Sequence, residues 1–130
     1  MILLVEDSED DVFLLERAMK KAQIHLPMHH AQHGQEALDY LQGKGKYSDR
    51  ETYPIPSLIL LDLKMPYVHG FEVLKWIRQQ PSLMNVRVVM LTASLEDKDR
   101  TRAEQLGAQG FFIKPPTPEI LARIFPNGSN

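Results

Sequence analysis

Acidic residues follow two of the apolar runs in this sequence. Glu6 and Asp7 come directly after Ile2–Val5, and Asp62 comes directly after Leu58–Leu61. Short continuous apolar runs are typical of strands that are covered on both faces, and the residue after such a strand emerges at the carboxyl edge of a parallel sheet. Open α/β sheets bind their ligands at this edge. The segment around Asp62, taken alone, also allows a second interpretation, in which the carboxylate caps the following turn.

Two later apolar runs also end in residues that can take part in chemistry. Thr92 follows residues 86–91, and Lys114 follows residues 111–113. If all four runs are parallel strands of one sheet, their carboxyl ends present three carboxylates, a hydroxyl and an ammonium group along one edge. Groups of this kind that converge on one place are a stronger indication of a site than any one of them alone.

These groups match the requirements of phosphoryl transfer to an aspartate. Three carboxylates in one pocket repel one another unless a cation is bound, and Mg²⁺ is commonly held by one or two carboxylates together with waters. An ionised Asp62 can attack phosphorus while Mg²⁺ and Lys114 neutralise the phosphoryl oxygens and the Thr92 hydroxyl donates a hydrogen bond to one of them. In the competing interpretation, Glu6 and Asp7 belong to an acidic helix start with residues 9–11, which the helix dipole favours.

An alternation of strands and helices must position these residues. Apolar runs predict strands at residues 2–5, 28–32, 58–61, 86–91 and 111–113, and helical periodicity predicts helices at residues 8–22, 35–42, 70–80, 95–106 and 118–125. Residues 43–56 are expected to form a polar loop. The alternation indicates an α/β fold, a single doubly wound (βα)5 domain over residues 1–130 with a parallel five-stranded sheet. In the order 2-1-3-4-5 the first and third strands are neighbours, which brings Glu6, Asp7 and Asp62 together.

The composition excludes several other kinds of site. The 130 residues include no cysteine, so a disulfide framework, cysteine-ligated zinc and thiol catalysis are excluded. A formal net charge of -2 does not favour a nucleic-acid surface. No apolar run approaches the roughly 20 residues of a membrane-spanning helix. We therefore expect a cytoplasmic protein that binds neither nucleic acid nor membrane directly and that carries no effector domain.

The motifs at the strand ends together resemble those of response-regulator receiver domains of two-component signalling, the CheY-like family. The matching stretches are residues 4–7, 61–66, 91–93, 107–108 and 114–115, with Gly70 on the helix that follows the third strand. The resemblance covers nearly the whole chain and implies a flavodoxin-like fold in which Asp62 accepts a phosphoryl group from a sensor histidine kinase. It also implies that Asp7 ligates Mg²⁺ directly beside Asp62, Glu6 acts through water, and the backbone carbonyl of Lys64 completes the protein ligands.

The resemblance further implies a switch that carries the signal away from the site. Thr92 and Phe111 occupy the switch positions, so that after phosphorylation the Thr92 hydroxyl moves towards the phosphoryl group and the Phe111 ring turns inward. Because Phe111 lacks the hydroxyl of the commoner tyrosine, ring packing must carry the change. Lys114 is expected to precede a cis proline, Pro115, an isomer that is costly at other residues.

The expected partners come from a narrower resemblance, to stand-alone receivers that partner bacterial phytochromes. It implies a phytochrome-type histidine kinase as the phosphoryl donor and a downstream protein or phosphotransfer protein as the target, with a homodimer left open. The chain would then be a phosphoacceptor that catalyses only its own phosphorylation and dephosphorylation. Two other classes compete. A metal-dependent hydrolase would need a second acid where Lys64 stands, and a pure interaction domain would not need the set formed by Glu6, Asp7, Asp62, Thr92 and Lys114.

Three histidines close together, His29, His30 and His33, could suggest a metal cluster. Adjacent side chains on a strand point to opposite faces, so this spacing does not favour a shared ion. A surface or edge role is expected instead.

Overall fold

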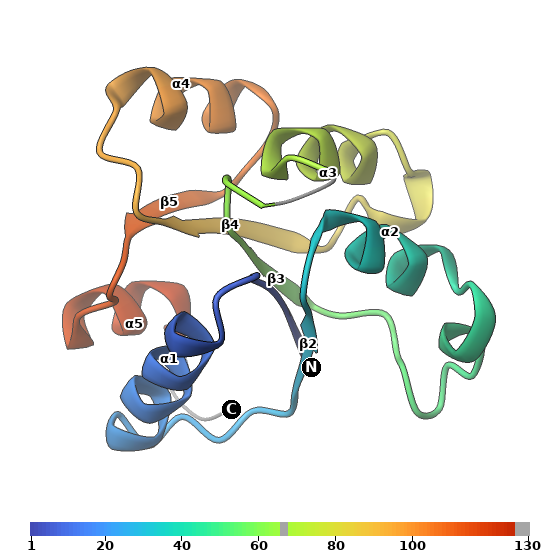
Figure 1. Ribbon diagram of the computed structural model, residues 1–130, viewed down its shortest axis with the longest axis horizontal. Helices are drawn as coiled ribbons and strands as arrows, with labels where there is room; N and C mark the ends of the chain where they lie inside the picture. Colours follow the sequence, from blue (N-terminus) through green and yellow to red (C-terminus); the bar gives the residue numbers. More distant parts are fainter. Residues whose placement is uncertain (66–67, 127–130) are drawn as a thin grey trace.

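The computed structural model describes residues 1–65 and 68–126 (Figure 1). Five parallel strands form one sheet in the order β2-β1-β3-β4-β5, which confirms the predicted order. The strands are β1 (Ile2–Val5), β2 (Met28–Ala31), β3 (Leu58–Leu61), β4 (Arg87–Thr92) and β5 (Gly110–Ile113). Pro66 of the motif after β3, and residues 127–130 of the predicted domain, lie outside the described residues.

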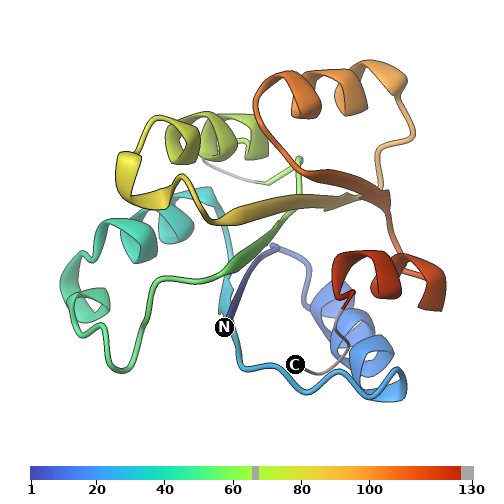
Figure 2. The same cartoon turned by 180° about the vertical axis from the view of Figure 1, so that it is seen from behind.

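Helices cover both faces of this sheet (Figures 1 and 2). One face carries α1 (Glu9–Lys21) and α5 (Pro118–Ile124), and the other carries α2 (Gly34–Gln42), α3 (Gly70–Arg78) and α4 (Asp97–Gln105). This arrangement is the flavodoxin-like, doubly wound α/β fold that the alternating sequence pattern predicted. It leaves the carboxyl ends of the strands open between the first turns of the helices.

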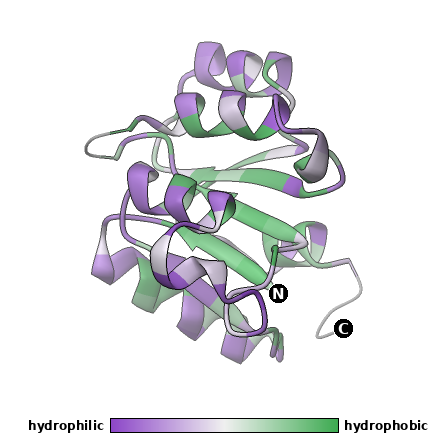
Figure 3. Ribbon diagram, turned by 90° about the vertical axis from the view of Figure 1, so that its right-hand side faces the viewer, coloured by the Kyte–Doolittle hydropathy of each residue, from purple (hydrophilic) through white to green (hydrophobic). Residues whose placement is uncertain are grey.

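The sheet divides the core into two layers because successive side chains of a strand point to opposite faces. Leu3 and Ile59 belong to the layer under α2, α3 and α4, whereas Leu4 and Leu60 belong to the layer under α1 and α5. Figure 3 shows the result, with hydrophobic strands in the middle and hydrophilic outer helix faces. Every residue of β1 and β3 is buried, which explains why these strands appear in the sequence as continuous apolar runs.

Helix ends follow from local hydrogen bonding. The Ser8 hydroxyl accepts a hydrogen bond from the Asp11 amide and starts α1, and Gly43, with φ of 72°, ends α2 in the left-handed conformation. Helices α3 and α4 each have one end two residues inside the predicted bounds. Helix α3 ends at Arg78 before a 3-10 turn at Pro81–Leu83, since a proline disfavours helix at the residue before it. Helix α4 begins after Glu96, and Leu95 lies outside it with 79% of its surface exposed.

The predicted polar loop at residues 43–56 contains an aromatic cluster instead of being uniformly solvated. It includes a short 3-10 helix, Gly45–Ser48, and its Tyr47 and Tyr53 rings lie 5.0 and 5.9 Å from the ring of Tyr40 on α2. The guanidinium of Arg50 donates to the carbonyls of Tyr40 (2.8 Å) and Leu41 (3.0 Å) at the end of that helix. The loop is therefore packed against α2 by ring contacts and by a capping arginine.

The three histidines have separate structural roles, in agreement with the expectation from their spacing. His29 packs against the Tyr53 ring at 5.3 Å, His30 Nε2 donates to the Glu6 carbonyl at 2.6 Å, and His33 Nδ1 accepts from the Glu36 amide at 3.1 Å. Residues 1–65 and 68–126 contain no helix that is long and apolar enough to cross a membrane.

Candidate functional site

The site lies where β1 and β3 end side by side. The two strands pair in parallel with Val5 opposite Leu61, so Glu6 and Asp62 leave the sheet at the same level. The ladder continues one step further, because the Asp62 amide donates to the Val5 carbonyl at 3.1 Å. This backbone hydrogen bond fixes Asp62 beside Glu6, as the predicted strand order required.

Three carboxylates converge at this edge. Glu6 and Asp62 are buried, with exposed fractions of 3% and 7%, whereas Asp7 is exposed. One oxygen from each lies within 4.8 Å of one oxygen from each of the others. Such a set of hard oxygen donors fits a small divalent cation such as Mg²⁺, because the separations allow one ion to contact them and the exposed Asp7 leaves room for waters. The acidic cluster at the predicted position is thus present.

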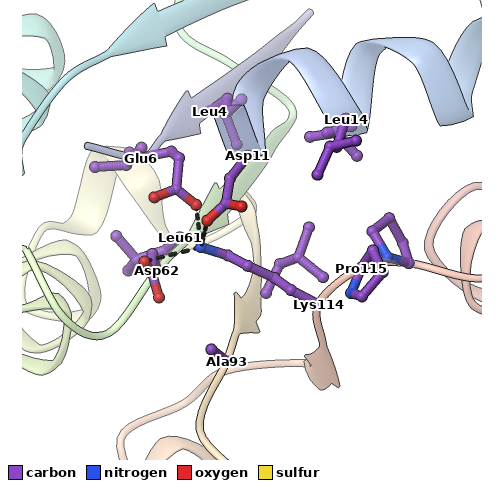
Figure 4. A pocket seen from close by; sticks show the side chains of 13 residues that line it. Leu4, Glu6, Asp11, Leu14, Leu61, Asp62, Ala93, Lys114 and Pro115 are labelled. Carbon is purple, nitrogen blue, oxygen red and sulfur yellow. Dashed lines mark hydrogen bonds and ion pairs between the residues drawn. The ribbon is translucent and has the colours of Figure 1, made fainter. Parts of the chain in front are cut away.

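Lys114 reaches into the same place from the end of β5 (Figure 4). Its Nζ forms ion pairs with Glu6, with Asp11 Oδ2 at 2.9 Å and with Asp62 Oδ2 at 3.0 Å. The Lys114 amide donates to the Thr92 carbonyl at 2.8 Å, which extends the β4–β5 pairing to the base of the side chain. The peptide bond from Lys114 to Pro115 is cis, as predicted, and turns the chain away immediately after the lysine.

Burial and charge act in opposite directions on the two most enclosed groups. Burial raises the pKa of Glu6 to about 7, although its hydrogen bond to Lys114 lowers it, and the nearby Asp62 charge raises it further. For Lys114, burial lowers the pKa, but hydrogen bonds to Glu6 and Asp11 together with the charge of Asp62 outweigh burial, so that its pKa is raised. Lys114 is therefore a permanent positive charge at neutral pH, directly beside Asp62.

The orientation of Asp62 is set by its own loop. Asp62 Oδ1 accepts a hydrogen bond from the Leu63 amide at 2.7 Å, while Oδ2 faces Lys114. The loop returns at Gly70, whose amide donates to the Leu63 carbonyl at 2.9 Å. A Cβ atom at Gly70 would lie 2.2 Å from the Asp62 carbonyl oxygen, so that only glycine allows this close approach. Gly70 thus holds the backbone on which Asp62 is presented.

A cavity of about 240 Å³ opens beside the charged groups. Its walls combine the site residues with apolar side chains from three other places: Leu14 on α1, Ala93 directly after β4, and Pro115 in the loop after β5. Asp62 and Lys114 both line it. The Asp62 carboxylate can therefore be approached by a small molecule without unfolding of the surrounding loops.

The predicted site residues Thr92, Lys64 and Phe111 take no part in the ion pairs of Lys114. Thr92 ends β4 as expected and is 1% exposed, but its Oγ1 accepts from the Ser94 amide at 3.3 Å and thus faces the β4–α4 loop. The Lys64 side chain is exposed. Phe111 is already 5% exposed, and the Arg100 guanidinium lies 5.1 Å from its ring centre. The Phe111 ring was expected to turn inward on phosphorylation, but it is already buried in this structure.

Two features of the site were not identified from the sequence. Asp11 was interpreted as part of a solvated acidic helix start, yet its side chain is only 35% exposed and pairs with Lys114. Nothing in the acidic pattern of residues 9–11 distinguished this carboxylate from its neighbours. The second feature is the Ser94 hydroxyl, which donates to Asp99 Oδ2 at 2.5 Å and joins the Thr92 loop to the first turn of α4. The sequence contained no signal for this contact either.

Comparisons with known proteins agree with this geometry. The response regulator receiver domain profile matches residues 2–125. Response regulator Rcp1 from Synechocystis sp. is 38% identical over 114 residues, which are 88% of this chain and 76% of Rcp1.

Solved structures similar to this chain carry the same fold. The Mn²⁺-bound form of response regulator Rcp1 has a TM-score of 0.79 at 36% identity, covering 95% of this chain and 86% of that one. The phosphorylated cyanobacterial phytochrome response regulator RcpA has a TM-score of 0.80 at 32% identity, with coverage of 95% and 86% respectively.

Proposed function

This chain belongs to the response regulator receiver domain family of two-component signalling, and we propose that it accepts a phosphoryl group on Asp62 from the phosphohistidine of a sensor histidine kinase. The observation that carries this proposal is the convergence of Lys114 on Asp62 beside the acidic cluster. A structural aspartate needs a partner, but it does not need two further carboxylates and an adjoining cavity.

The chemistry follows from the groups present. A lone pair on an Asp62 carboxylate oxygen forms a new O–P bond while the P–N bond of the phosphohistidine breaks, and the departing electron pair stays on the imidazole nitrogen, which takes up a proton. No general base is required, because the aspartate is already ionised. The Lys114 ammonium neutralises charge on the phosphoryl oxygens as they approach, which is the main catalytic requirement of such a transfer.

Glu6, Asp7 and Asp62 would hold a divalent cation, with the Lys64 backbone carbonyl as the further ligand implied by the family. When bound, Mg²⁺ supplies positive charge that offsets the repulsion between the carboxylates and the incoming phosphoryl group. The Mn²⁺-bound form of Rcp1 supports a divalent site of this kind in a similar protein.

The donor is proposed to be a phytochrome-type histidine kinase. RcpA, one of the similar structures, is a phytochrome response regulator and was obtained in phosphorylated form. The target is proposed to be a downstream protein or phosphotransfer protein that binds the phosphorylated chain. A second copy of the chain would be a further partner, so that phosphorylation would lead to a homodimer. In this scheme the chain acts on no separate substrate.

The signal is proposed to leave through Thr92. A phosphoryl group on Asp62 would attract the Thr92 hydroxyl away from the Ser94 amide, and the loop to α4 would then rearrange beside Phe111. Amide shifts over residues 93–125 with and without beryllofluoride test this step. We expect shifts in the parent that are lost in Thr92→Ala, and equal shifts in both proteins would contradict it.

Incubation with acetyl phosphate and Mg²⁺, followed by mass spectrometry, tests the proposed function itself. We expect one acid-stable, base-labile adduct that is absent in Asp62→Asn, because the amide has nearly the same shape but is not a nucleophile. Chelation of Mg²⁺ and Asp7→Asn should each suppress the reaction. Sustained phosphate release without an adduct would indicate a hydrolase, and no reaction at all would indicate an interaction domain.

A further inference from the structure

Asp11 forms an ion pair with Lys114, although the proposed phosphoryl transfer to Asp62 assigns Asp11 no role. Its Oδ2 lies 2.9 Å from Lys114 Nζ, a charge-assisted hydrogen bond of good length. It belongs to α1, whereas Glu6 and Asp62 follow β1 and β3. Figure 4 shows its carboxylate turned towards the Lys114 ammonium.

The ammonium group of Lys114 has three donor hydrogens, and it faces three carboxylates. Two of these three partners change during the proposed reaction, since Glu6 and Asp62 would turn to a cation and Asp62 would become esterified. Asp11 is the partner that keeps its chemical state throughout. A lysine side chain is flexible, and without a fixed partner its ammonium would lose part of its position when the other two contacts change.

Asp11 is itself well placed to act as such a fixed partner. Its amide donates to the Ser8 hydroxyl at 3.2 Å in the first turn of α1. The same helix is anchored to the core through the buried Leu15 and Met19. Asp11 is therefore carried by a helix that is packed on the core and is separate from the loop after β3 that carries Asp62.

We propose that Asp11 is a positioning residue that anchors the Lys114 ammonium beside Asp62 while the other partners of that ammonium change. This inference rests on the proposed phosphoryl transfer to Asp62 for its functional consequence. Asp11 itself touches neither the phosphorus nor the acceptor oxygen.

The neighbouring Asp10 offers a matched control. It carries the same charge in the same helical turn, is exposed, and forms no contact with Lys114. Three variants are compared with the parent, Asp11→Ala, Asp11→Asn and Asp10→Ala, after circular dichroism has shown that each is folded. The asparagine keeps an oxygen that can accept a hydrogen bond, so it also serves if the alanine variant does not fold.

Two measurements are made on each protein. The first is the initial rate of labelling by saturating acetyl phosphate with Mg²⁺. We expect Asp11→Ala to be about tenfold slower, Asp11→Asn to recover most of the rate, and Asp10→Ala to match the parent, given the strength of hydrogen bonds between charged groups. The second is the ¹⁵N signal of the Lys114 ammonium without metal or phosphoryl donor. This signal should broaden strongly in Asp11→Ala, less in Asp11→Asn and not at all in Asp10→Ala, because the ammonium protons exchange with water more rapidly when a charged partner is lost.

Equal labelling rates in Asp11→Ala and the parent would overturn the inference, because the contact would then have no effect on the rate. Labelling that is slowed equally in Asp10→Ala and Asp11→Ala would also overturn it, because the slowing would then be due to net charge alone. If the alanine variant does not fold, Asp11→Asn takes its place. A slower labelling rate and a broader ammonium signal in Asp11→Asn than in Asp10→Ala then support the inference, and values equal to those of Asp10→Ala overturn it. If the parent is not labelled at all, the proposed function fails. The ammonium signal then decides the anchoring contact, which an unchanged signal in Asp11→Ala would overturn.

Discussion

Replacement of Gly70 by alanine is expected to damage both the stability and the chemistry of this protein. The added Cβ would lie 2.2 Å from the Asp62 carbonyl oxygen and 2.8 Å from the Leu63 Cα. Real Cβ atoms essentially never approach closer than 3.0 Å, and both neighbours are backbone atoms that cannot rotate away. Either α3 or the loop after β3 must therefore move by most of an ångström.

The expected magnitude follows from the cost of overpacking. Extra atoms in a well-packed place cost about 1–3 kcal/mol, and a clash with backbone belongs at the upper end of that range. Against this, alanine is favoured over glycine in a helix by about 0.5–1 kcal/mol. The net loss in the free energy of unfolding should therefore be about 2 kcal/mol, a substantial part of the roughly 5–15 kcal/mol typical of such domains.

Urea unfolding measures this loss, with Gly45→Ala as the matched control. Gly45 has nothing within 4 Å of its added Cβ, so only its positive φ of 57° opposes the change. We expect that variant to lose about 1 kcal/mol and to keep the parent labelling rate. In Gly70→Ala the labelling of Asp62 should fall by up to about a hundredfold, since a displacement of about 1 Å can cost that much. A Gly70→Ala protein with parent stability and parent labelling would refute the close approach of Gly70 to the Asp62 backbone.

Three other changes test the ion cluster, the core and the aromatic loop. Lys114→Met should lower the free energy of unfolding by about 3–5 kcal/mol, because buried carboxylates lose their countercharge, and Mg²⁺ should restore part of it; an unchanged urea midpoint would contradict the pairing. Phe111→Ala should cost about 3–5 kcal/mol, as expected for a buried ring, and a loss below about 1 kcal/mol in urea unfolding would place the ring outside the core. Burial raises the pKa of Tyr40 from 10.0 to about 12. Between these two values the tyrosine ionises in the unfolded chain but not in the folded one. The contribution of Tyr40 to the free energy of unfolding should therefore be fully present below pH 10 and be lost as the pH rises towards 12. Urea midpoints from pH 9 upward should fall more steeply in the parent than in Tyr40→Phe, and equal slopes would argue against a buried hydroxyl.

The sequence alone was sufficient to predict the architecture and the centre of the site. Strands that are buried on both faces consist of continuous apolar residues. The ends of these strands can therefore be located in the sequence as the ends of apolar runs. The alternation of strands with helices then restricted the topology to a parallel sheet. In such a sheet the residues that directly follow each strand lie along one edge, the carboxyl edge. Glu6, Asp62 and Lys114 were brought together in the prediction by this backbone rule, without knowledge of any side-chain conformation.

The tertiary structure decided the contacts that depend on packing between distant segments. Asp11 and Lys114 are 103 positions apart, and nothing in the acidic pattern of residues 9–11 distinguishes the carboxylate that turns inward from those that stay in water. Phe111 is buried in this structure because Arg100 and the core beneath α4 enclose its ring, which its position on β5 alone did not reveal. The loop at residues 43–56 is polar in composition, yet Tyr47 and Tyr53 pack on α2. Backbone hydrogen bonding follows local rules that a sequence displays directly, whereas side-chain partners are chosen among all segments that the fold brings within reach, and that choice exists only after folding.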